Sequence, residues 1–390
     1  MVLSIKKTLF HNYTIQKLRL VAIVLFAIIG VVIVLRAFAS NTNEYFEAEE
    51  AVLSGGAVII SEEAASGQTY IKFSGLASNV NGPLQPHSLG FAPFAYVAWG
   101  DVSLDETRAA TGVQHYIAAF MLGAGGCSPT WGGESVNDLD SSRSTIIAND
   151  ISSIRSHGGD VMVSFGGQAG TELAIACGST TSLKDAYKRV IDRYGLSMLD
   201  FDIEGPATSD EAANQRRVEA IRELQQEMPN LKIWLTLAVN DPGGLDGDGR
   251  AIIQDMKNGG VVIAGVNIMV MDYAFDSRDM AQAAINAAEA TFNQLKNIYG
   301  DSADDATIWK AIGLIPMIGQ NDTQPEVFTL ANAQTLHEYA VQKGIGLVSM
   351  WNVNRDESCP GGGGYVSDTC SGIDQIPFQF MDTLNMPALP

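Results

Sequence analysis

Eight short apolar runs, separated by segments of helical periodicity, constrain the fold of this chain more than any other feature. Most of these runs are almost continuously apolar, which is typical of parallel strands that are buried on both faces. The runs that we predict as strands are Phe94–Trp99, His115–Met121, Val161–Phe165, Met198–Ile203, Ile233–Val239, Val266–Met271, Ile312–Ile318 and Gly346–Trp351.

The segments between these runs carry apolar residues three and four positions apart, the spacing of a helix with one buried face. Eight strands alternating with helices over roughly 290 residues predict an α/β fold, a closed (β/α)₈ barrel whose usual size is about 250 residues. An open doubly wound sheet is the alternative, but it normally has a glycine-rich nucleotide turn after its first strand, and none is found there. The clearest predicted helices are Asp185–Tyr194, Ser209–Glu227, Met280–Tyr299 and Ala331–Lys343.

Residues 1–39 differ from the rest of the chain. Basic residues precede an uninterrupted apolar run, Val21–Leu35, and Ala37-Phe38-Ala39 follows it as a small-x-small cleavage pattern. The run of about fifteen residues suits the core of a signal peptide, because a relaxed membrane span needs about twenty. The long basic lead-in fits a retained membrane anchor over residues 20–36 nearly as well. We therefore expect export, with the protein either secreted or held at the cell surface.

A short, turn-rich preface precedes the first predicted barrel strand. Its Glu-Ala-Glu start, at Glu47, is similar to the opening of jelly-roll carbohydrate-binding modules, but residues 44–76 are too few to close such a sandwich. A linker with a hairpin or two is the simpler interpretation, and we assign it no binding role. The expected organisation is residues 1–39 as signal peptide or anchor, 40–90 as linker or truncated module, and 91–385 as the barrel.

The chain has four cysteines, an even number that suits an oxidising compartment. Cys359 and Cys370 bracket a glycine-rich loop, so a local disulfide between them is expected. Cys127 and Cys177 would then form the second pair. No Cys-x-x-Cys spacing occurs, which argues against a zinc knot.

The chain is strongly acidic, with a formal net charge of −20 at pH 7. Phosphate binding needs clustered Lys and Arg, which the sequence lacks, so we expect no nucleic-acid partner. A large net charge keeps a protein soluble, and this is the simplest role for it here. We expect a monomer.

Three acids occupy alternate positions on the fourth predicted strand, at Asp200, Asp202 and Glu204. Alternate side chains of a strand point to the same face, so the acids would face the barrel axis, with Glu204 nearest the C-terminal mouth where barrel enzymes have their active sites. Burying three charges is costly, which disfavours a purely structural role. Proximity should raise at least one pKa, so that Glu204 can donate a proton near neutral pH. A divalent metal site is the rival interpretation.

Other strand ends should bring further side chains to the same mouth. Adjacent glycines at the end of the third strand allow backbone and substrate to approach closely. Flat aromatic faces at a barrel mouth are surfaces on which sugar rings stack, although core packing is an equally good interpretation for the loop tryptophan after the second strand, Trp131. The candidate substrate-binding residues are Ser164, Gly166, Met271, Asp272, Tyr273, Trp351 and Trp131.

Taken together, these segments resemble the family 18 glycoside hydrolases, the chitinases. The resemblance covers about three quarters of the chain, starting at Phe91-Ala92-Pro93. Bacterial members containing Asp-Phe-Asp-Ile-Glu-Gly are especially similar. The segments that carry the resemblance are Ser164-Phe165-Gly166-Gly167, Asp200-Phe201-Asp202-Ile203-Glu204, Met269–Tyr273, Pro316-Met317-Ile318-Gly319 and Trp351.

The sequence departs from the family pattern in two places. The family motif usually has an Asp-Gly pair whose Asp lies three residues before the first core acid, and here those positions are Ser197 and Met198. This departure puts the fine tuning of the site's pKa values in question. Family members often end strand six in Met-x-Tyr-Asp, which would put Met271 in the Tyr place and Asp272 in the Asp place, so that Tyr273 would have to substitute for the phenol.

The resemblance implies retaining hydrolysis of chitin without an enzymic nucleophile and without a metal or cofactor. Glu204 would protonate the glycosidic oxygen, and the substrate's own N-acetyl carbonyl would attack the anomeric carbon. Asp202, backed by Asp200, would orient the acetamido group, which Asp272 and Tyr273 would hold. The implied substrate is chitin or another GlcNAc-containing polysaccharide. An endo-β-N-acetylglucosaminidase acting on glycans or peptidoglycan, and a catalytically inactive chitin-binding lectin, are the alternatives.

Overall fold

The computed structural model describes residues 57–61, 69–73, 81–273 and 278–385, which belong to two units, residues 1–78 and 79–390. In the first unit, β1 (Ala57–Ser61) and β2 (Thr69–Phe73) form an antiparallel hairpin. The predicted signal peptide or anchor over residues 1–39 lies outside the described residues. Within the described ranges, no helix is both long and apolar enough to cross a bilayer.

The second unit is built around a curled sheet of parallel strands in the order β3-β15-β12-β11-β9-β8-β7-β5-β4. The two ends of this path, β3 (Gly90–Phe91) and β4 (Phe94–Tyr96), are separated in the sequence by only Ala92 and Pro93. They are therefore two halves of one strand, of which β3 pairs with β15 and β4 pairs with β5. This shared strand closes the sheet and confirms the predicted (β/α)₈ barrel.

Every predicted strand overlaps an observed one. The sixth ends two residues earlier than predicted because Asp272 takes a left-handed conformation (φ 51°), which turns the chain out of the ladder. The other barrel strands are β5 (His115–Gly123), β7 (Asp160–Gly166), β8 (Met198–Asp202), β9 (Lys232–Asn240), β11 (Gly265–Met269), β12 (Ile312–Ile315) and β15 (Leu347–Val348). Short additional strands are β6 (Pro129–Trp131), β10 (Gly244–Leu245), β13 (Gly319–Gln320) and β14 (Val327–Phe328).

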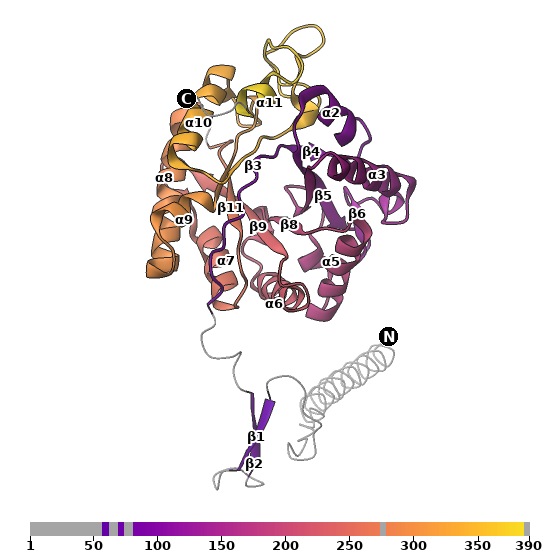
Figure 1. Ribbon diagram of the computed structural model, residues 1–390, viewed down its shortest axis with the longest axis vertical. Coiled ribbons are helices and arrows are strands. Elements are labelled where there is room, and N and C mark those ends of the chain that lie inside the picture. The colour runs from indigo at the N-terminus through magenta and orange to yellow at the C-terminus, as the bar shows by residue number, and fades with distance from the viewer. Residues whose placement is uncertain (1–56, 62–68, 74–80, 274–277, 386–390) are drawn as a thin grey trace, which may run out of the picture. The chain divides into compact units, whose positions relative to one another are not determined.

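Helices surround the strands in a ring (Figure 1). The predicted start at Asp185 is five residues late, because the Ser179 and Ser182 side chains form a reciprocal capping box at the true start of α5. The helices are α2 (Leu104–Thr111), α3 (Ser142–Ser156), α4 (Leu173–Ala176), α5 (Thr180–Tyr194), α6 (Glu211–Glu227), α7 (Gly247–Asn258), α8 (Met280–Tyr299), α9 (Asp305–Lys310), α10 (Leu330–Lys343) and α11 (Gln379–Leu384).

Packing on the outer face of β8 fixes which way the acidic strand faces. Leu199 and Phe201 are fully buried. The Phe201 ring stacks on Phe165 of β7 with centroids 5.4 Å apart and meets Tyr187 of α5 edge-on at 5.1 Å. Because these apolar residues alternate with the acids, their burial against the helices turns the acids toward the barrel axis.

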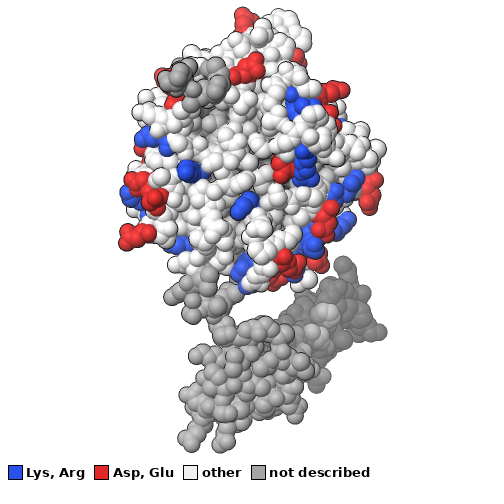
Figure 2. All heavy atoms as spheres, viewed as in Figure 1, with Lys and Arg blue, Asp and Glu red and all other residues white. Residues whose placement is uncertain are grey.

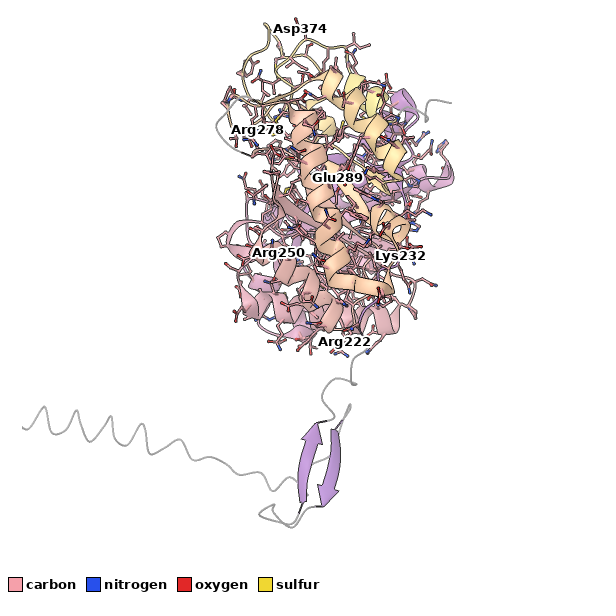
Figure 3. The ribbon with its side chains drawn as sticks, turned by 90° about the vertical axis from the view of Figure 1, so that its left-hand side faces the viewer. Arg222, Lys232, Arg250, Arg278, Glu289 and Asp374 are labelled. Carbon is pink, nitrogen blue, oxygen red and sulfur yellow. A yellow bond between two sulfur atoms is a disulfide. The ribbon has the colours of Figure 1, made fainter. Side chains whose placement is uncertain are left out.

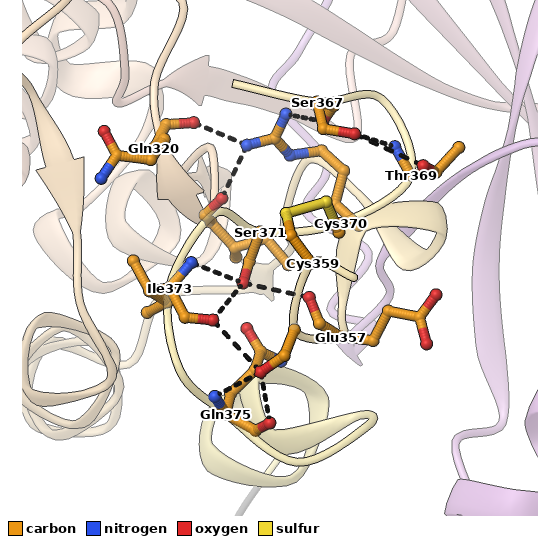
Figure 4. Close-up of a disulfide and its surroundings, with 12 residues drawn as sticks. Gln320, Glu357, Cys359, Ser367, Thr369, Cys370, Ser371, Ile373 and Gln375 are labelled. Atoms are coloured by element: carbon orange, nitrogen blue, oxygen red, sulfur yellow. Dashed lines mark hydrogen bonds between the residues drawn. A yellow bond between two sulfur atoms is a disulfide. The ribbon is translucent and has the colours of Figure 1, made fainter. Parts of the chain in front are cut away.

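Both predicted disulfides, Cys127–Cys177 and Cys359–Cys370, are present. The second closes the glycine-rich loop, and Figure 4 shows how this loop is tied to β13. There the Gln320 N–H donates to the Ser371 carbonyl at 2.7 Å, next to Cys370. A guanidinium N–H of Arg355 donates to the Gln320 carbonyl at 2.6 Å. The loop therefore supports the segment that follows strand β12.

Charges of both signs are interspersed over the face shown in Figure 2, with wide uncharged areas between them. Some of the surface charges pair between neighbouring helices. Glu289 of α8, labelled in Figure 3, lies 2.6 Å from the Lys343 ammonium of α10 and accepts the Tyr339 hydroxyl at 3.1 Å. Exposed pairs of this kind stabilise a protein by about 1 kcal/mol or less, so the barrel depends mainly on its apolar packing.

Phe201→Ala should lower the free energy of unfolding by about 3–5 kcal/mol, because it removes a fully buried ring from between strand and helix. Chemical denaturation of the purified protein would measure this loss. Ile376→Ala is the matched control, since Ile376 is 64% exposed and its truncation should change stability by about 0.5 kcal/mol or less. A loss below about 1 kcal/mol for Phe201→Ala would contradict the packing described for β8.

Candidate active site

Strand β8 presents its three acids at increasing exposure toward the C-terminal mouth. Asp200 is fully buried, Asp202 is 4% exposed, and Glu204, two residues beyond the strand, is half-buried. The alternation predicted from the sequence therefore brings the three carboxyls together along the barrel axis. Of the three, only Glu204 has appreciable access to solvent.

Hydroxyl groups from the two neighbouring strands hold the deepest acid. The Ser164 hydroxyl of β7 donates to one oxygen of Asp200 at 2.6 Å, and the Thr236 hydroxyl of β9 donates to the other at 2.7 Å. Burial raises the pKa of Asp200 to about 7, and the two hydroxyl groups oppose part of that rise because they stabilise the ionised form. Ser164 therefore positions Asp200, and it is not among the residues that line the cavity in front of the acids.

Asp202 and Glu204 interact as a carboxyl pair. Burial raises the pKa of Glu204 to about 7; the hydrogen bond with Asp202 opposes this rise, and the charge of Asp272 adds to it. The pKa of Asp202 lies well above its ordinary value, first because of burial and then because of Glu204 and Asp200. The Oδ1 atom of Asp202 is buried and has no hydrogen-bond partner among the described residues. The pair can thus hold a proton near neutral pH while keeping one acceptor oxygen unused.

The backbone at Gly166 passes so close to the acidic strand that only glycine fits there. Gly166 has φ 109°, and a Cβ atom at this position would lie 2.0 Å from the Asp202 carbonyl oxygen. The next residue, Gly167, donates its N–H to that same carbonyl at 2.9 Å. The close approach at Gly166 is therefore to the backbone of Asp202, and the predicted contact of Gly166 with substrate stays a prediction.

A cavity of about 340 Å³ opens in front of these acids, within the range of small-ligand sites. Among the described residues, no three His, Cys, Asp or Glu side chains are placed to hold a metal ion. The predicted residues that line the cavity are Asp202, Glu204, Met271, Asp272, Tyr273 and Trp351.

Asp272 and Tyr273 are held at the cavity wall by the segment that follows β12. The Asp272 carboxylate accepts the Thr323 backbone N–H at 2.7 Å. The backbone N–H of Tyr273 donates to Glu326 at 3.0 Å, and the Tyr273 hydroxyl is buried without a hydrogen-bond partner in the described part of the chain. Burial raises the pKa of Tyr273 well above its usual value, so its hydroxyl stays protonated and remains a donor. A donor and an acceptor, the Tyr273 hydroxyl and Asp202 Oδ1, thus belong to residues of the same cavity.

Aromatic rings form the floor of the cavity. The Trp351 ring stacks on Phe120 with centroids 5.4 Å apart and an interplanar angle of 18°, and it lies 6.0 Å from Phe94. Phe94, Phe120, Gln168 and Asn240 line the cavity but were not predicted. Phe120, Gln168 and Asn240 lie at or just beyond the C-terminal ends of predicted strands, and this position would have indicated them.

Trp131 does not reach the cavity, and its prediction as a substrate-binding residue is corrected here. It is fully buried in β6, and its indole N–H donates to the Tyr194 hydroxyl at 2.7 Å. Strand β6 folds back antiparallel onto β5, which carries the indole into the core and away from the mouth. The core-packing interpretation of Trp131 is therefore the correct one.

Ser197, which replaces the outer family aspartate, lies before the start of β8. Its side chain is exposed and donates to Asp160 at 3.2 Å. Seven residues of extended chain, about 23 Å, separate it from Glu204. The raised pKa of Glu204 depends on burial and on acids within the site, so the departure at Ser197 leaves its main causes in place.

Comparison with known proteins places the chain in a family. No protein-family model matches it. It is 35% identical to active domain 2 of a chitinase from Pyrococcus furiosus, covering 78% of this chain and 95% of that one with a TM-score of 0.68. The chain belongs to the family 18 chitinases. A family 18 chitinase from Pseudoalteromonas aurantia, 15% identical over 67% of this chain and 93% of its own, shares the fold with a TM-score of 0.50.

Two curated relatives are longer than the region they share with this family 18 member. The chain is 34% identical over 265 residues, 64% of its length, to a probable bifunctional chitinase/lysozyme of Escherichia coli. It is 35% identical over 219 residues, 53% of its length, to an endochitinase of Metarhizium anisopliae. The chain spans 28% of the first relative and 42% of the second.

Asp200→Asn should make the stability of the protein less dependent on pH. Asp200 ionises near pH 7 in the folded protein but near pH 4 in the unfolded chain, so folding takes up a proton between these values. The stability that it contributes is complete below about pH 4 and is lost as the pH rises through about 7. The substitution should therefore remove up to about 3 kcal/mol of the stability difference between pH 5 and pH 8, because about two of the pH units over which the proton is lost fall in this window.

Urea denaturation at the two pH values would measure this difference for the parent and the variant. Asp248→Asn removes an exposed carboxylate from α7 and controls for the change in net charge. If the difference between pH 5 and pH 8 is the same in the parent and in Asp200→Asn, the raised pKa assigned to Asp200 is wrong.

Proposed function

We propose that this protein is a chitinase that hydrolyses the β-1,4 bonds between N-acetylglucosamine units with Glu204 as the proton donor. The observation that carries the proposal is a carboxyl with a pKa of about 7, paired with a buried carboxyl, at the wall of an aromatic-floored cavity. Identity of 35% over 95% of a Pyrococcus furiosus chitinase domain supports it, as does a structure of mutants of that domain complexed with chito-oligosaccharides.

The first step is protonation of the glycosidic oxygen by Glu204. Because its pKa is near 7, a large fraction of Glu204 is protonated at neutral pH, and hydrolysis should decline as the pH rises above that value. Asp202 is buried and paired with Glu204, so it does not lie across the sugar ring, where a nucleophile would have to be. Membership of family 18 implies that the nucleophile comes from the substrate instead.

The carbonyl oxygen of the substrate's N-acetyl group serves as that nucleophile. It attacks the anomeric carbon as the bond to the leaving oxygen breaks, which gives a cyclic oxazolinium ion and a free hydroxyl on the departing sugar. The unpartnered Oδ1 of Asp202 suits the acetamido N–H, and the protonated Tyr273 hydroxyl suits the acetamido oxygen. Water, deprotonated by Glu204, then attacks the anomeric carbon and opens the oxazolinium ring, so that the configuration at the anomeric carbon is retained overall. Trp351 supports the apolar face of the sugar from below.

Export of the protein is part of the proposal. The two disulfides support it, because such bonds persist in oxidising compartments. The basic and apolar N-terminal sequence agrees, as a signal peptide or as an anchor over residues 20–36. Expression in a secreting host followed by mass determination would separate these two: a released form starting near Ser40 indicates cleavage, and a full-length membrane-bound form indicates an anchor. Full-length protein confined to the cytosol would refute export.

A second candidate function is cleavage of N-acetylglucosamine bonds in peptidoglycan. The observation that favours it is the name of the Escherichia coli relative, a probable bifunctional chitinase/lysozyme, of which this chain spans 28%. Both polymers contain the N-acetyl group that the proposed mechanism needs. Chitin is the better-supported substrate, because the relative aligned along 95% of its length is a chitinase domain.

Glu204→Gln should reduce hydrolysis of N-acetylglucosamine hexamer by about 10³-fold or more, because the amide cannot donate the proton to the leaving oxygen. Chromatography of the released oligomers, with peptidoglycan tested in parallel, would measure the loss. Glu338→Gln, an exposed change on α10, controls for loss of one carboxylate. Binding of the hexamer by the parent without any cleavage would favour the inactive lectin, and activity abolished by EDTA would favour a metal-dependent hydrolase.

A further inference from the structure

The cavity wall contains a carboxylate, Asp322, that has no assigned part in binding or hydrolysis of the acetamido sugar. Asp322 follows β13 and lines the cavity together with Glu204 and Asp272. Its side chain is exposed to solvent. Within the described ranges it accepts no hydrogen bond and forms no ion pair. Its carboxylate is therefore available to a ligand in the cavity.

The backbone on both sides of Asp322 is anchored. On one side, the Asn321 amide donates to the Met317 carbonyl at 2.9 Å, and Gln320 is tied to the disulfide loop (Figure 4). On the other side, the Thr323 N–H donates to the Asp272 carboxylate at 2.7 Å. This last bond links the segment of Asp322 directly to the second acid of the wall. Asp322 thus has a fixed place next to Asp272.

The electrostatics of the cavity favour a cation. Among the described residues that line it are four carboxyl groups, from Asp202, Glu204, Asp272 and Asp322, and no Lys or Arg. Partial burial, and next the charge of Asp272, raise the pKa of Asp322, whereas Arg355 acts in the opposite direction. Carboxylates that raise one another's pKa repel, and a cation between them relieves that repulsion. The buried, unpartnered Oδ1 of Asp202 is an independent sign that this cavity is built to receive a polar ligand.

We propose that Asp322, with the charge of Asp272 beside it, binds the ammonium group of a glucosamine unit, so that the site favours partly N-deacetylated chitin over fully acetylated chitin. This inference rests on the proposed function. The reacting sugar must keep its N-acetyl group, because its carbonyl oxygen is the nucleophile. The ammonium group therefore belongs to a neighbouring unit of the same chain. Such an amine carries one positive charge to meet the carboxylates when it is protonated, so the substrates are compared in mildly acidic solution.

The test compares two substrates of equal length, a fully acetylated hexamer and a partly deacetylated one, in the parent and in Asp322→Asn. We expect the ratio of kcat/KM, deacetylated over acetylated, to fall about three- to fivefold in the variant, the effect of one exposed ion pair. The difference between parent and variant should shrink in 1 M salt, where charges are screened beyond about 3 Å. Asp374→Asn is the matched control, an exposed acid outside the cavity lining, labelled in Figure 3, that should leave the ratio as in the parent.

An unchanged ratio in Asp322→Asn, or an equal fall in Asp374→Asn, would overturn the proposal. If the parent cleaves neither hexamer, it is the proposed function that fails, and calorimetry then decides about Asp322. In that measurement, a glucosamine hexamer should bind Asp322→Asn about three- to fivefold more weakly than the parent. Equal affinity would refute the proposed cation site.

Discussion

The burial of carboxyl groups inside the closed barrel is the constraint on which the rest of the structure depends. Asp200 is tolerated there because hydroxyl groups from both neighbouring strands, Ser164 and Thr236, donate to its two oxygens. These bonds require β7, β8 and β9 to be adjacent and in one register, which the closed sheet provides. The same register brings Gly166 against the Asp202 carbonyl, where a side chain would collide. The acidic site therefore depends on the pairing of β7, β8 and β9 within the barrel sheet.

Burying the acids of β8 lowers the stability of the fold, and the apolar side chains on the other face of the same strand offset this loss. Raised pKa values mean that the fold disfavours the ionised acids relative to water, so the barrel loses stability as the pH rises. Leu199 and Phe201, alternating with the acids, are fully buried against the helices and contribute roughly 2–3 kcal/mol each. A strand of alternating acids and apolar residues thus contains both the functional group and the packing that keeps it in place.

Local patterns predicted the barrel and the common face of the three acids, because both depend on periodicity or on position at a strand end. The disulfides followed from the even number of cysteines and from the loop that two of them bracket. The alternation of Asp200, Asp202 and Glu204 fixes their common face whatever the loops do. Trp131 was predicted wrongly because its position depends on a short strand, β6, that turns back onto β5, and no local pattern indicates that return. The position of Phe120 at a strand end could have indicated it, but its stacking on Trp351, more than two hundred residues away in the sequence, could not be predicted. Contacts between distant strands are the part that local patterns do not contain.

The acids of the cavity differ in exposure, and this difference decides which of them can donate a proton. Glu204 and Asp202 are removed from water, so their neutral forms are favoured, and Glu204 can act as a proton donor. The Asp272 carboxylate accepts the Thr323 backbone N–H at the wall, and Asp322 is exposed to solvent. The charge of Asp272 in turn raises the pKa of Glu204. The charge of Asp272 therefore helps to keep the proton on Glu204. A cation bound beside Asp272 would weaken this effect and lower the pKa of Glu204.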